Sequence, residues 1–206
     1  MRLPPRDNVP SQAPAGPDEF VLTQVLNGTV QQVWDAFTQA QQLRQWWGPH
    51  AVRTTEVAID LRVGGRYLLL QEFDGKTYPL KGEFLEIDAP HKLVMTMDCS
   101  DHPSAWHDAV NPARGGNANP AGVMVMAVYF EAIDASGKTG SDPRGKTGAS
   151  FANTRLTIRT CFESANIRNT LVEMGMNVGW AESLEKLDAL VSGAAARFRR
   201  SGTQGD

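Results

Sequence analysis

Near its C-terminus the chain carries an apolar pattern that is typical of a long amphipathic helix. Ser164 is suited to cap the start of this helix, and Gly193 to end it. Gly175 and Gly179 lie within it, and each costs about 1 kcal/mol relative to alanine. We therefore expect that their missing side chains either let the helix approach the sheet closely or leave room for a ligand. Apolar residues recur every three or four positions: Ile167, Leu171, Met174, Val178, Ala181, Leu184, Leu187 and Val191.

The chain before this helix is dominated by strand patterns. Val57, Ile59 and Leu61 alternate with polar neighbours, which is the period-two signature of a half-buried strand. Turn-forming residues such as Asp74-Gly75 separate the runs and favour antiparallel pairing. The predicted strands cover residues 20–26, 57–61, 66–73, 78–87, 93–97, 123–133 and 154–162.

Two short helices are predicted between the first two strands. Thr29 and Gln32 form a capping-box pattern that opens the first helix, and Thr38 and Gln41 repeat it for the second. The fold class is therefore α+β, with an antiparallel sheet of about six or seven strands, two short helices after the first strand and a long C-terminal helix.

A chain of 206 residues fits one domain. Residues 1–18 contain five prolines and little apolar surface, so we expect a disordered leader without packed elements. The domain itself is predicted over 19–192. Residues 193–206 follow as a flexible basic tail.

Charge and composition argue against several classes of partner. Hydrophobic residues make up 41% of the chain, which is ordinary for a globular protein, and the net charge of -3 does not favour nucleic acid or anionic lipid. No apolar run approaches the length of a membrane span, and we see no secretory signal, so we expect a cytoplasmic protein. In that compartment we expect both cysteines, Cys99 and Cys161, to be reduced.

The chain carries six short motifs: Val33-Trp34-x-Ala36-Phe37-Thr38, Leu43-x-x-Trp46-Trp47-Gly48-Pro49, Gly64-Gly65-Arg66-Tyr67, Gly82-x-Phe84-x-Glu86-Ile87, Pro90-x-x-Leu93-Val94 and Gly179-Trp180-x-x-Ser183-Leu184-x-x-Leu187. Together they resemble the activator of heat shock protein 90 ATPase C-terminal-like family of the START-like (SRPBCC, helix-grip) superfamily. The resemblance covers residues 20–191. It implies a curved sheet that grips the C-terminal helix, and it allows lipid binding, hormone reception, polyketide cyclisation or co-chaperone activity.

One segment matches the phosphate-loop pattern by its letters. Residues 140–147 read Gly, four residues, Gly-Lys-Thr, but a strand is predicted after them where a phosphate loop requires a helix. We therefore interpret the match as accidental.

Residues 98–122 are too long for a hairpin turn and gather polar side chains with one indole. Cys99, His102 and His107 are possible metal ligands, but His102 and His107 are five apart with Pro103 between them, so we favour a polar loop without metal. Long loops in compact domains are often functional. We therefore predict a lid, with Trp106 at the mouth of a cavity.

The first functional hypothesis is a non-enzymatic domain that binds an apolar small molecule between the sheet and the C-terminal helix, without cofactor or metal. The second is a chaperone-associated or stress-related interaction domain with a filled core. The third is a cyclase or hydrolase that uses His102 or His107. The candidate ligand-binding residues are Trp46, Trp47, Tyr67, Leu69, Phe73, Met95, Met97, His102, Trp106, His107, Met174 and Val178.

Overall fold

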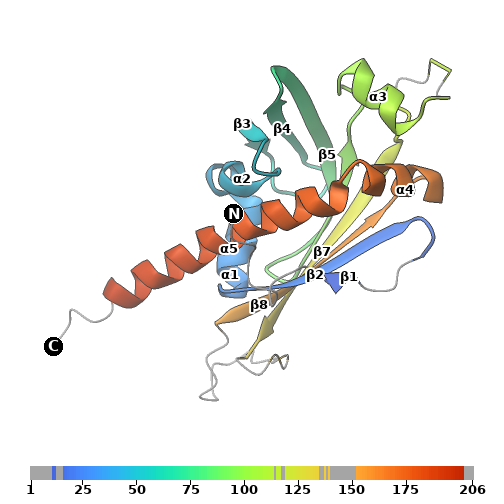
Figure 1. The fold of residues 1–206 in the computed structure, drawn as a ribbon. Coiled ribbons are helices and arrows are strands. Elements are labelled where there is room, and N and C mark those ends of the chain that lie inside the picture. The colour runs from blue at the N-terminus through green and yellow to red at the C-terminus, as the bar shows by residue number, and fades with distance from the viewer. Residues whose placement is uncertain are drawn as a thin grey trace, which may run out of the picture.

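The computed structural model describes residues 11–12, 16–113, 115–116, 119–134, 137, 139 and 152–201. One antiparallel sheet runs through it in the order β1-β2-β8-β7-β6-β5-β4-β3. The sheet curves, and the C-terminal helices cross its concave side (Figure 1). The strands are β1 (Ser11–Gln12), β2 (Glu19–Leu26), β3 (Arg53–Ile59), β4 (Arg66–Phe73), β5 (Lys76–Asp88), β6 (Lys92–Asp98), β7 (Val123–Ile133) and β8 (Asn153–Cys161).

The predicted fold class is confirmed, with one small addition. β1 lies within residues 1–18, which the sequence predicts to lack packed elements, and it pairs with β2. Backbone pairing needs no apolar side chain, so composition could not indicate this strand. Gly137 and Thr139 are the described positions between 135 and 151, and the phosphate-loop match at 140–147 lies outside the described residues.

The two short helices are α1 (Val30–Thr38) and α2 (Ala40–Trp46). The capping box at Thr29 is confirmed, because its side chain accepts from the Gln32 backbone and Gln32 accepts from the Thr29 backbone. The second predicted box is wrong. Thr38 is the last residue of α1, where its hydroxyl donates to the Trp34 carbonyl oxygen at 2.8 Å, and Gln39 takes the cap position of α2.

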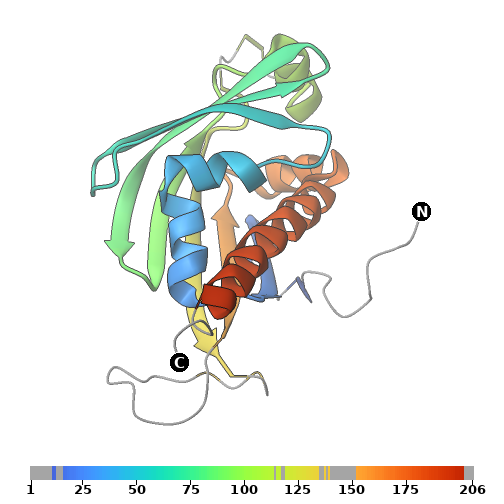
Figure 2. The same cartoon turned by 90° about the vertical axis from the view of Figure 1, so that its left-hand side faces the viewer.

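The predicted long helix is broken near its start. It consists of α4 (Ala165–Glu173), capped by Ser164 as predicted, and α5 (Met176–Ser201), so it also continues beyond Gly193. Gly175 forms the junction with a φ of 95°, a left-handed conformation that glycine adopts without steric cost. Figure 2 shows α5 crossing the concave face beside α1 and α2.

The core lies between the concave face and the helices. The rings of Phe37 and Trp46 are 4.7 Å apart, and the Phe37 and Phe130 rings are 5.2 Å apart in an edge-to-face contact. Burial of each such side chain contributes about 1.5–3 kcal/mol. The helices α1 and α2 therefore seal one end of the concave face, and the other end lies under α3 (Ser104–Val110), α4 and the start of α5 (Figure 1).

In the part of the chain that the structure describes, no helix is both long enough and apolar enough to cross a membrane.

Candidate functional site

An open cleft of about 880 Å³ lies at the end of the concave face that α1 and α2 leave uncovered. Pockets for small molecules commonly measure about 300–1,000 Å³. The cleft is bounded by the sheet, by α3, by the α4–α5 junction and by the segment that follows α2. Its lining includes Trp47, Gly48, Pro49, Val52, Gln71, Phe73, Tyr78, Leu80, Met97, Cys99, His102, Ala105, Trp106, Ala109, Met124, Thr160, Leu171, Met174, Gly175, Met176, Val178, Gly179, Trp180, Glu182 and Ser183.

The floor of the cleft comes from neighbouring strands. Met97 of β6 is paired across the strands with Met124 of β7, so both thioethers lie on the same face of the sheet. Tyr78 and Leu80 are two residues apart on β5 and lie on one face for the same reason. Unbranched methionine side chains are flexible, so this floor can adapt to apolar surfaces of different shapes.

Adjacent tryptophans at the end of α2 have different roles. The Trp46 side chain is fully buried, and its Nε1 donates to the Ala36 carbonyl oxygen at 2.8 Å. Trp47 lies against the cleft and contacts Trp180 of α5 edge to face, with ring centroids 5.4 Å apart. The hydroxyl of Thr54 donates to the Trp47 carbonyl oxygen at 2.8 Å and fixes this wall.

The helical wall is formed around the α4–α5 junction. Met174 and Val178 are on the rim, where 43% and 56% of their surface is exposed. Gly179 lies one turn after Gly175, and a Cβ placed on it would have its nearest contact at 3.9 Å, with the Pro49 ring. The missing side chain therefore leaves space in the cleft, which is one of the two explanations that the sequence suggests for this glycine.

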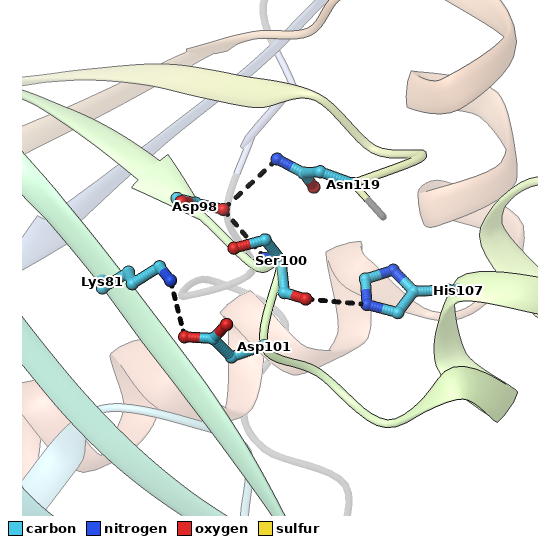
Figure 3. Close-up of polar contacts among 6 residues, drawn as sticks. All are labelled: Lys81, Asp98, Ser100, Asp101, His107 and Asn119. Carbon is cyan, nitrogen blue, oxygen red and sulfur yellow. Dashed lines mark hydrogen bonds and ion pairs between the residues drawn. The ribbon is translucent and has the colours of Figure 1, made fainter. Parts of the chain in front are cut away.

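The fourth wall comes from residues 99–109 of the segment 98–122, where the helix α3 replaces the predicted loop. Polar contacts hold the start of this segment to the sheet (Figure 3). Lys81 of β5 pairs with Asp101 at 2.6 Å, and Asp98 accepts from the Ser100 backbone at 2.8 Å and from Asn119 Nδ2 at 3.2 Å.

The two histidines of this segment are placed differently. His102 is half-buried and lies in the cleft wall, between the rings of Tyr78 and Trp106 at centroid distances of 5.3 and 4.5 Å. His107 is buried outside the lining, and its Nε2 donates to the Ser100 carbonyl oxygen at 3.2 Å (Figure 3). Burial, together with the neighbouring His107, lowers the pKa of His102 to about 4, so its imidazole is neutral at pH 7.

A thiol also reaches the cleft. Cys99 is buried, and burial raises its pKa to about 12, with a smaller contribution from the Asp98 carboxylate. The thiolate is the nucleophilic form of cysteine, and the raised pKa keeps this thiol protonated at neutral pH.

Several predicted ligand-binding residues lie outside the cleft, in the core. Trp46 and His107 are described above. Tyr67, Leu69 and Met95 border a void of about 10 Å³ under α2, which has room for about one water molecule. The Tyr67 hydroxyl donates to the Thr96 carbonyl oxygen at 2.6 Å. Strand alternation predicts the face on which these side chains lie, but not which helix covers them. The predicted residues that do line the cleft are Trp47, Phe73, Met97, His102, Trp106, Met174 and Val178.

Met124, Tyr78 and Trp180 also line the cleft, although they are not among the candidate residues that the sequence suggests. Met124 alternates with Met126 in β7, and Tyr78 with Leu80 in β5, so the period of two could have placed them on a covered face. Trp180 belongs to one of the sequence motifs, but its position opposite Trp47 depends on how α5 crosses the sheet.

Among the described residues, no group of three or more His, Cys, Asp or Glu side chains is arranged to hold a metal ion.

An antiparallel sheet that curves around a C-terminal helix, with an apolar cleft beside that helix, defines a domain of the START-like helix-grip class. The profile of the family described as Activator of Hsp90 ATPase homolog 1-like protein matches residues 27–140. The chain belongs to this family, as the motifs in its sequence predict. No curated protein is significantly similar to it in sequence.

Solved structures agree on the fold. A protein from Nitrosomonas europaea is 22% identical with a TM-score of 0.65, and the match covers 88% of this chain and 99% of that one. A protein from Arthrobacter aurescens is 23% identical with a TM-score of 0.62, covering 85% and 87%. A protein from Rhodobacter sphaeroides is 15% identical with a TM-score of 0.66, covering 89% and 99%. At these identities the similarity concerns the fold alone.

Proposed function

We propose that this protein binds an apolar small molecule in the cleft between its sheet, α3 and the α4–α5 junction. The observation that carries the proposal is the cleft itself, which has about 880 Å³ of space beside mostly apolar and aromatic side chains. Apolar surface removed from water contributes about 25 cal/mol per Å² before the costs of association. A ligand of moderate size therefore has enough apolar wall to bind with useful affinity.

A second candidate is a chaperone-associated or stress-related interaction domain. The name of the family refers to a homolog of an activator of the Hsp90 ATPase. The rim also exposes large apolar side chains, namely Phe73 at 46%, Met174 at 43% and Val178 at 56% of their surface. A protein partner would use this rim and leave the interior of the cleft empty, so substitutions inside the cleft separate the two candidates.

Acid–base catalysis by the histidine-bearing segment has weaker support. His102 is the histidine of that segment that lines the cleft, and its pKa of about 4 makes it a weak general base at pH 7. We therefore favour binding over a cyclase or hydrolase reaction. The cytoplasmic location expected from the sequence remains a prediction.

Titration with the neutral fluorescent probe N-phenyl-1-naphthylamine tests the proposal, because its emission rises in apolar surroundings. We expect saturable binding to the wild-type protein. Gly179→Leu should weaken binding at least tenfold, since the new side chain occupies the cleft, and it should not destabilise the helix, because leucine favours it over glycine.

Gly193→Leu is the matched control. It makes the same change on the same helix, away from the cleft lining, and a Cβ there meets no described atom within 4 Å. It should leave the affinity unchanged. Absence of saturable binding to the wild type, or equal binding to wild type and Gly179→Leu, would contradict the proposal.

A further inference from the structure

The imidazole of His102 is a polar group without a hydrogen-bonding partner in the wall of a mostly apolar cleft. Neither Nδ1 nor Nε2 has a partner among the described residues, and both nitrogens are shielded from solvent. A buried polar group that is left unpaired costs about 1–3 kcal/mol. Such a group in a binding cleft is a feature that a ligand can satisfy.

The nearest acidic side chains are engaged elsewhere. Asp101 pairs with Lys81, and Asp98 accepts from Ser100 and Asn119, so these carboxylates stabilise the segment instead of orienting the His102 ring (Figure 3). Asp98 and Asp101 still act on His102 through space, because both raise its pKa against the larger effect of burial. They also disfavour an anionic group beside this ring.

The charges along the cleft lining also disfavour an anionic ligand. Of the described residues that border the cleft, none is lysine or arginine, and Glu182 is acidic. Glu182 accepts a hydrogen bond from the His50 backbone at 2.9 Å, which holds it at the edge of the cleft. A carboxylate or phosphate on the ligand would therefore lose its hydration without gaining a positive partner.

We infer that His102 is a specificity-determining residue, which selects neutral apolar ligands that carry a hydroxyl group. This inference rests on the proposed function. A neutral imidazole presents one N–H donor and one bare nitrogen acceptor, and a hydroxyl group can both donate and accept. It can therefore pair with either ring nitrogen in either tautomer, whereas a hydrocarbon leaves both unpaired.

In this proposal a ligand reaches His102 when the Trp106 indole, one of the two rings that flank it, moves aside. The imidazole and indole rings are in edge contact at 4.5 Å, and the half-buried indole belongs to a helix of seven residues. Rotation of the indole exchanges a ring contact for a hydrogen bond to the ligand. The hydroxyl group thus reaches a nitrogen that solvent does not reach in the unliganded arrangement.

Competition experiments against N-phenyl-1-naphthylamine at pH 7 test the inference. They use three compounds that share the naphthalene ring and differ in its substituent: 2-naphthol, naphthalene and 2-naphthoate. We expect the wild-type protein to bind 2-naphthol about tenfold more tightly than naphthalene, and 2-naphthoate most weakly. His102→Phe should bind 2-naphthol and naphthalene within about twofold of each other. His102→Gln keeps a donor and an acceptor, and should retain most of the preference.

His91→Phe is the matched control, because His91 is exposed and lies in the β5–β6 turn outside the cleft lining. It should keep the wild-type order. If His102→Phe does not fold, His102→Leu is the second apolar variant with the same expectation. Equal wild-type affinities for 2-naphthol and naphthalene, or a preference that survives both apolar variants, would overturn the inference while the proposed function stands. Absence of binding by all compounds, the probe included, would overturn both.

Discussion

The ring of His102 meets the indole of Trp106 edge to face, with centroids 4.5 Å apart and an interplanar angle of 73°. Trp106 also contacts the ring of His107, at a centroid distance of 5.3 Å. The indole therefore connects a histidine that borders the cleft to one that anchors α3 through the Ser100 carbonyl group. This contact makes the position of α3 and the environment of His102 interdependent.

The burial of His102 predicts a specific pH dependence of stability. Its pKa is about 4 in the folded protein and has its ordinary value of 6.5 in the unfolded chain, so between these values the unfolded state binds more protons. The contribution of His102 to the free energy of unfolding should therefore fall as the pH drops from about 6.5 to about 4, and level off below that.

Urea unfolding of the wild type and His102→Gln at several pH values checks this dependence. His107, Asp98 and Asp101, whose charges act on His102, are present in both proteins, so the difference between the two curves isolates its titration. The wild type should lose more stability than the variant on acidification. Parallel curves across this range would contradict the burial of the ring.

Removing the indole should speed ligand exchange. Trp106 packs against the core and borders the cleft, and it belongs to α3. Trp106→Ala therefore opens one wall of the cleft without changing a residue of the sheet. We expect the dissociation rate of N-phenyl-1-naphthylamine, measured by stopped-flow fluorescence, to rise about tenfold or more, with an unchanged circular dichroism spectrum. Ser104→Ala, at an exposed position on the same helix, should leave the rate unchanged. An unchanged rate in Trp106→Ala would show that the indole is no lid.

Two glycines four residues apart should respond in opposite directions to the same substitution. Gly175→Ala forces an L residue to a φ of 95° and should lower the free energy of unfolding by about 1–2 kcal/mol, although space is open around it. Gly179→Ala replaces glycine within α5 and should raise it by about 1 kcal/mol, since its Cβ has only an ordinary contact at 3.9 Å. Chemical denaturation measures both. Effects of equal sign would contradict the helix break at Gly175.

Tyr67 should matter for stability and not for binding. Its side chain is buried, burial raises the pKa of the phenol far above its usual value, and its hydroxyl donates to the Thr96 carbonyl oxygen. Tyr67→Phe should lower the free energy of unfolding by about 1–2 kcal/mol while the affinity for N-phenyl-1-naphthylamine stays the same. A large loss of affinity would place Tyr67 in the binding site after all.

Much of the fold is encoded in short-range patterns. The strand patterns in 66–73, 123–133 and 154–162 predict β4, β7 and β8, and the Thr29 capping box predicts the start of α1. Thr38 shows the limit of such a pattern, because a hydroxyl can bond backward to the preceding turn as easily as it can cap the next helix.

The cleft depends on contacts between segments far apart in the chain. Tyr67, Leu69 and Phe73 alternate onto one face of β4, yet α2 covers the first two while Phe73 borders open space. Neighbouring Trp46 and Trp47 are divided in the same way, between the core and the cleft wall. Local periodicity specifies the direction of a side chain but not the element that lies opposite to it. That element is selected by the crossing of α5 and the docking of α3, because an apolar face becomes core or binding surface only when distant parts of the chain pack against it or leave it open.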